Sequence, residues 1–310
     1  MRNRLMLLGL LVAAILAGCG KTTKPSDPLS GGPAAATDKA AVGNVLSQNP
    51  NAVDEDVFST GLATDVTADM GFAAITPLHF WRTITDVDRT FDFQFSAPDS
   101  SGRPTMALVT VNKHLTGTFN VAFGDTTATD TSIQVAKKPL DDHWERHLLL
   151  HRVERDSMHA VEDEQDGDDG WRLVGISGVE VTSKNAVTAI SSVRVQAGAL
   201  DTTITDPLQL HRLRRFILIP DLTHVTVTVT THANDDVVVF FGNDSRRRFH
   251  NNGDGTYTFS WTTSDFPGFR HFGVNALSHG TLFDDTAPYD SQAWVVPFVV
   301  RDADEEIEHD

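Results

Sequence analysis

The sequence predicts a mostly β protein, in which an α+β domain built on an antiparallel sheet is followed by a β-sandwich. The main observation is that large apolar residues alternate with polar ones in short stretches, as in Phe91–Phe95 and Val225–Val229. Clusters of Gly, Pro, Asn and Asp separate these stretches, as turns between strands require. The chain has 310 residues, which is enough for two separate cores.

The charge of the chain argues against a nucleic-acid partner. The formal net charge is −17, and the apolar content of 40% is that of a globular protein. The two dense basic runs, at 212–215 and 246–248, are too short to neutralise a polyphosphate against that field. We therefore expect no nucleic-acid binding.

The first 19 residues have the features of an export signal. Arg2 and Arg4 precede an apolar run over residues 5–17, which is too short to span a bilayer but is the length of a signal peptide core. Leu16-Ala17-Gly18-Cys19 follows, and this motif resembles the lipobox of bacterial lipoproteins. The resemblance implies that residues 1–18 are removed and that Cys19 becomes the acylated first residue.

Cys19 is the only cysteine of the chain, so no intramolecular disulfide competes for its thiol. The predicted partner of the acylated residue is the lipid bilayer, which holds two or more acyl chains stably. Gly20 stands where such lipoproteins carry Asp when they stay at the inner membrane. The resemblance therefore implies an outer-membrane or cell-surface location.

The next segments are predicted to be a tether and an α+β domain. Residues 19–50 are rich in Pro, Gly, Ser, Thr and Ala, which predicts a flexible tether. Residues 51–198 are assigned to the α+β domain, with helix expected over 51–85 and strands after it, and a bulge or kink is expected at Leu115–Gly117. The order of helices before a sheet resembles the NTF2-like arrangement.

The last part of the chain predicts a sandwich. Residues 201–207 are interpreted as a linker, residues 203–302 as the sandwich and residues 303–310 as an acidic tail. The stretch Gly253–Phe259, the later Val274–Ala276 and a closing strand over residues 294–300 resemble bacterial immunoglobulin-like domains. Paired cysteines are absent, so the core is expected to rest on four aromatic residues, Phe240, Trp261, Phe272 and Trp294. Pro297 predicts that the closing strand lies at a sheet edge.

The richest polar constellation is His143, Glu145 and His147. On a strand these three side chains share one face and offer two imidazoles and a carboxylate to a zinc-like ion. On a helix, His143, His147 and His151 would stack instead. The order His-x-Glu-x-His differs from the zinc-protease motif, and an ordinary strand with solvated or paired side chains explains it as well.

Three other motifs have structural explanations. The acidic run at 163–170 lacks the spacing of a calcium loop, and 251–255 has the composition of a tight turn. The run Gly175–Gly178 falls one residue short of a nucleophile elbow. No nucleotide-binding glycine motif is present, so no catalytic residue and no cofactor is predicted.

These observations predict a lipid-anchored cell-envelope protein with a non-catalytic binding or structural role, whose partner is an envelope protein or a glycan. The alternative is a lipid-anchored hydrolase or small-ligand-binding domain that uses the His/Glu cluster of residues 143–151.

Overall fold

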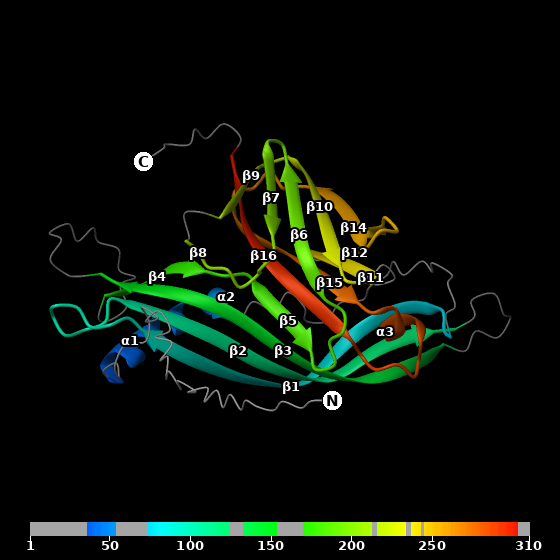
Figure 1. Cartoon of the computed structure of the whole chain (residues 1–310), viewed down its shortest axis with the longest axis horizontal. Helices are drawn as coiled ribbons and strands as arrows, with labels where there is room; N and C mark the ends of the chain where they lie inside the picture. Colours follow the sequence, from blue (N-terminus) through cyan, green and yellow to red (C-terminus); the bar gives the residue numbers. More distant parts are fainter. Residues whose placement is uncertain are drawn as a thin grey trace, which may run out of the picture.

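The structure, a computed structural model, describes residues 36–53, 74–124, 133–153, 170–212, 216–233, 237–242 and 245–302. Within these residues the chain is mostly β, as predicted, and it forms two sheets with three helices against them (Figure 1). The predicted signal, Cys19, the acidic run at 163–169 and the tail at 303–310 lie outside the described residues.

The larger sheet has eleven strands and spans the long axis of the molecule (Figure 1). Its main path runs, in order, through β1 (Pro77–Phe95), β2 (Met106–Phe123), β3 (Gln134–Arg152), β5 (Val179–Ser183), β16 (Ser291–Arg301), β15 (Gly268–Leu277), β11 (Val237–Gly242) and β12 (Ser245–Arg248). Three strands lie off this path: β4 (Trp171–Ile176) pairs with β3 and with β8 (His211–Arg212), and β9 (Ile217–Pro220) pairs with β16. All pairs are antiparallel except the parallel pair of β9 with β16.

The second sheet has five antiparallel strands and stands over one part of the first (Figure 1). Its order is β13 (His250–Asn251), β14 (Thr256–Thr262), β10 (His224–Thr231), β6 (Ile190–Ala197) and β7 (Leu200–Ile204). The two sheets enclose a core that includes Val225, Val227 and Val229 of β10. The predicted alternation of β10 is therefore confirmed.

Strands β11, β16 and the second half of β15 are buried on both faces of the larger sheet, and this explains their nearly continuous apolar sequences. In β16, Trp294 and Val296 point into the core shared with the second sheet, whereas Ala293 and Val295 point into a core on the opposite face. That second core also holds the helices α1 (Ala36–Gln48), α2 (Pro50–Val53) and α3 (His279–Phe283). The fold thus has three layers: helices, large sheet and small sheet.

Helix α1 lies inside the segment 19–50 that was expected to be a tether. Its buried residues are Asp38, Ala41, Val42, Val45 and Leu46, which follow the spacing of one helical face. These side chains are small and stand among Gly, Asn and Ser, so the composition is that of a linker although the spacing is that of a helix. The buried Asp38 carboxylate fixes the helix by accepting a hydrogen bond from Arg103 at 2.5 Å.

Of the helix expected over residues 51–85, the described parts are residues 51–53 and 74–85, and residues 54–73 lie outside the described residues. Helix α2 ends at Val53, and residues 77–85 belong to β1. This half of β1 pairs along its length with residues 116–123 of β2, so cross-strand hydrogen bonds decide its conformation.

The segment 201–207, expected to be a linker, contains most of β7, which pairs with β6. The strands of each sheet come from both sides of the predicted boundary at residues 198–203. In the larger sheet, β5 pairs with β16, and in the smaller sheet β6 pairs with β10. The position of a strand along the sequence therefore does not indicate the sheet to which it belongs.

The prediction that Pro297 places the last strand at an edge is wrong, because β16 has neighbours on both sides. On one side it pairs with β15 throughout. On the other side β5 pairs with residues 292–295 and β9 with residues 298–301. Pro297 falls outside both of these ladders on that side, where no backbone N–H is needed.

The predicted irregularity at Leu115–Gly117 is confirmed as a bulge between β1 and β2. The register shifts between Ile84 and Asp86, which pair with Gly117 and Thr116. A Cβ atom on Gly117 would lie 2.0 Å from the backbone oxygen of Thr83. Only glycine allows the two strands to approach so closely here.

Candidate functional site

The three residues of the His/Glu cluster lie together on β3, which decides between the strand and helix interpretations in favour of the strand. Glu145 stands between the two histidines, with Oε1 2.9 Å from Nε2 of His147 and Oε2 3.6 Å from Nε2 of His143. The side chain of His143 is 55% exposed, whereas those of Glu145 and His147 are 29% and 25% exposed. The cluster is therefore half-open to solvent.

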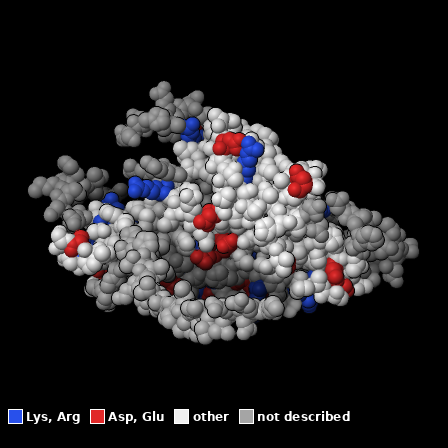
Figure 2. All heavy atoms as spheres, in the orientation of Figure 1, with Lys and Arg blue, Asp and Glu red and all other residues white. Residues whose placement is uncertain are grey.

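Further carboxylates surround Glu145 on the same face of the sheet. Glu145 pairs across the strands with Glu180 of β5, and Glu180 pairs with Trp294 of β16. Burial raises the pKa of Glu180 above its usual value, and the charges of Glu145 and Asp206 raise it further. Figure 2 shows Asp and Glu atoms gathered near the middle of one face of the molecule.

The geometry does not favour a metal at His143, Glu145 and His147. His147 uses both ring nitrogens for oxygen acceptors, since Nδ1 lies 3.2 Å from the carbonyl oxygen of Leu208 while Nε2 faces Glu145. A metal ligand needs a ring nitrogen with a free lone pair. In the described part of the chain, no group of three or more His, Cys, Asp or Glu side chains is arranged to hold a metal ion.

Two further motifs have the structural explanations expected for them. Ser177 is fully buried, and its hydroxyl donates to the carbonyl of Gly178 and accepts from the backbone N–H of His147. It is therefore inaccessible as a nucleophile. In the turn before β14, Asp254 accepts hydrogen bonds from the backbone N–H and the hydroxyl of Thr256, so its carboxylate stabilises the turn.

A groove of about 300 Å³ opens between the two sheets, where β14 faces β11 and β15. It is lined by Phe240, Gly242, Arg247, Phe259, Ser260, Trp261, Thr262, His271, Phe272 and Phe298. This volume is at the lower end of the range for small-molecule sites. The lining combines five aromatic rings with a few polar groups, as ligand sites do.

The aromatic rings of the groove form one continuous cluster. The ring centroid of Phe240 lies 4.5 Å from that of Phe259 and 4.9 Å from that of Trp261. Trp261 is in turn 5.4 Å from Phe272, which is 5.9 Å from Phe298. These contacts hold the rings in fixed orientations, because each ring is supported by another.

The rings divide into a buried floor and an accessible wall. Phe240, Phe272 and Phe298 are at most 5% exposed, whereas Phe259 and Trp261 of β14 are only partly buried. The expected sandwich core therefore holds Phe240, Phe272 and Trp294, and Trp261 packs against its margin instead. Trp261 shares a face with Phe259, as the alternation predicted, but this face reaches the open side of the sandwich.

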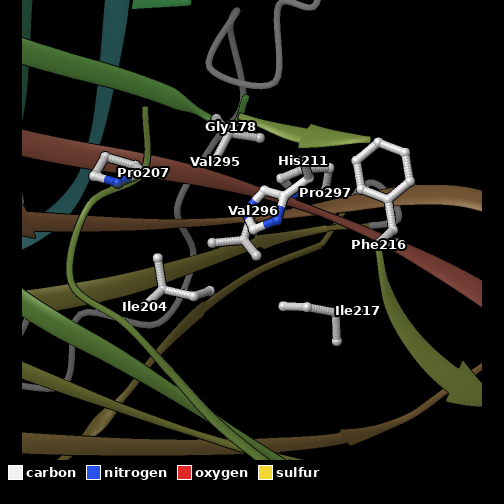
Figure 3. Close-up of a pocket in the computed structure, with 9 residues that line it drawn as sticks. All are labelled: Gly178, Ile204, Pro207, His211, Phe216, Ile217, Val295, Val296 and Pro297. Carbon is white, nitrogen blue, oxygen red and sulfur yellow. The ribbon is translucent and has the colours of Figure 1, made fainter. Parts of the chain in front are cut away.

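A second cavity, shown in Figure 3, offers little room for a ligand. It is enclosed by Gly178, Ile204, Pro207, His211, Phe216, Ile217, Val295, Val296 and Pro297. Its volume of about 10 Å³ is that of a single water molecule. Burial lowers the pKa of His211, the only titratable residue in this lining. We therefore take the aromatic groove as the candidate site.

No protein-family model, curated protein or solved structure matches the chain. Among the described residues, no helix has both the length and the apolar character needed to cross a membrane.

Proposed function

We propose that the chain is a lipid-anchored cell-envelope protein with a non-catalytic binding role, and that it binds a saccharide in the aromatic groove. The observation that carries this proposal is the pair of partly buried rings, Phe259 and Trp261, in a groove that is also lined by the cationic residue Arg247.

The chemistry of sugars fits such a lining. A pyranose ring presents C–H groups on its faces, which pack against aromatic rings, and hydroxyl groups around its rim, which need hydrogen-bond partners. The wall of the groove offers Phe259 and Trp261 for the faces. Arg247, which lines the groove and is exposed, offers N–H donors for the hydroxyl groups of the rim.

The lipid anchor is proposed from the sequence of residues 1–19. An apolar segment after Arg2 and Arg4 and the motif Leu16-Ala17-Gly18-Cys19 support it. The anchor places the groove at the outer membrane or the cell surface, where glycans are abundant and an envelope protein is the other possible partner.

The alternative role, a hydrolase or small-ligand site at the His/Glu cluster, has less support. Hydrolysis needs a general base together with a nucleophile or an activated water. Both ring nitrogens of His147 are already within hydrogen-bond distance of protein oxygens, those of Glu145 and of the Leu208 carbonyl. The nearby Ser177 is buried. The contacts of this cluster tie β3 to the segment that follows β7.

A binding measurement with Trp261→Ala tests the saccharide role. Intrinsic fluorescence or calorimetry should detect binding within a panel of cellohexaose, chitohexaose and hexagalacturonate, and the variant should bind at least about tenfold more weakly, as the loss of a stacking ring predicts. Trp81→Ala is the matched control, because Trp81 of β1 lies outside the groove and should leave affinity unchanged. Failure of every panel member to bind the natural protein would refute the saccharide role.

The anchor is tested by Cys19→Ser. Cells that express the natural protein should incorporate labelled palmitate into it and hold it in the membrane fraction, and the variant should lose both properties. If neither protein takes up the label, the lipid anchor is wrong, whatever the groove binds.

A further inference from the structure

Arg247 is the only lysine or arginine among the described residues that line the aromatic groove. It lies on β12 directly opposite Phe240 of β11, and it is exposed. Its side chain therefore projects from the same face of the sheet as that of Phe240 in the aromatic floor.

Arg247 differs from three other described arginines, each of which pairs with a carboxylate. Arg82 pairs with Asp142, Arg103 with Asp38 and Arg194 with Asp201. For the Arg247 side chain, the structure gives no hydrogen bond or ion pair with any described side chain, and no Asp or Glu belongs to the described lining.

We infer that the groove selects an acidic saccharide, whose carboxylate is held by Arg247 while its ring packs on Phe259 and Trp261. This inference rests on the proposed function and names the ligand class of the same site. A planar guanidinium group binds a carboxylate through two parallel hydrogen bonds, so it recognises both charge and shape.

The overall acidity of the protein makes this contact selective. At physiological ionic strength, charges act over about 8 Å, so the charge of Arg247 acts locally on a ligand in the groove, whereas the net charge of −17 repels anions from the protein as a whole. A polyanion that relies on charge alone is disfavoured, whereas a saccharide that also stacks on the rings gains both interactions. Uronic acid units, which carry a carboxylate on a pyranose ring, meet this requirement.

The test compares hexagalacturonate with its fully methyl-esterified form, which keeps the rings and removes the charge. Calorimetry on the full mature protein should give at least about tenfold tighter binding of the acid than of the ester. Arg247→Gln should remove this difference by weakening the binding of the acid, and an unchanged circular dichroism spectrum and melting temperature show that the variant is folded. Arg212→Gln, an exposed arginine of β8 outside the groove, is the matched control and should keep the preference.

The possible failures separate the two proposals. Equal binding of acid and ester, or a preference that survives Arg247→Gln, would overturn the acidic ligand while the saccharide role stands. If the protein binds neither the acid nor the ester, and binds neither cellohexaose nor chitohexaose, both the acidic ligand and the saccharide role are wrong. Raising the NaCl concentration from about 0.15 to about 0.5 M should weaken the binding of the acid and leave the binding of the ester unchanged.

Discussion

At the scale of single residues, Glu180 should contribute to the pH dependence of the free energy of unfolding. Burial, the largest cause, and the charges of Glu145 and Asp206 raise the pKa of Glu180 above 4.5. The folded protein therefore holds this proton more tightly than the unfolded chain. The stabilising contribution is fully present below pH 4.5 and is lost as the pH rises through the folded pKa.

We therefore expect Glu180→Gln to gain stability relative to the natural protein as the pH rises above 4.5. Urea denaturation between pH 4 and pH 7 measures the difference. Asp201→Asn is the control. The hydrogen bond from Arg194 lowers the pKa of Asp201 below 3.8, so the stability that this carboxylate contributes is lost only below pH 3.8 and stays constant between pH 4 and pH 7. A constant difference between Glu180→Gln and the natural protein across this range would contradict the prediction.

At the scale of elements, the bulge between β1 and β2 depends on Gly117. Gly117→Ala places a Cβ atom against the backbone of Thr83, which cannot move without breaking the pairing of these strands. We expect a loss of at least about 2 kcal/mol in the free energy of unfolding, measured by chemical denaturation.

Gly43→Ala is the matched control for the bulge. Gly43 lies in α1, and a Cβ atom there meets nothing within 4 Å. Alanine is the better helix former by up to about 1 kcal/mol, so this variant should be neutral or more stable. Similar effects of the two substitutions would show that the close approach at Gly117 is not what constrains the bulge.

At the scale of the whole molecule, the two sheets share strands from distant parts of the sequence. A fragment of residues 203–302 lacks β5, the partner of β16, and β6, the partner of β10. It would leave an unpaired edge on β10 and expose the face of β16 that packs on the helical side.

We expect that this fragment shows no cooperative thermal transition by circular dichroism, whereas the full chain shows one transition with the same midpoint in the near and far ultraviolet. A cooperative melt of the isolated fragment would show instead that the sandwich strands form a separate core.

The sequence by itself determined which residues share a face. Strict alternation predicted the inward valines of β10 and the common face of Phe259 and Trp261, because the period of a strand is a local property. The same reasoning placed His143, Glu145 and His147 together on β3, and the kink at Gly117 followed from glycine within a strand pattern.

Only the tertiary structure decided which strands are neighbours and what each face meets. The paired residues of β5 and β16 lie 110 to 116 residues apart in the sequence, and no local pattern specifies such partners. Arg247 and Trp261 meet at the groove because β12 pairs with β11 while β14 belongs to the facing sheet. The helix α1 and the internal place of Pro297 likewise depend on contacts with the large sheet. The candidate site is therefore a product of long-range packing, whose free energy comes from surfaces that distant segments bury together.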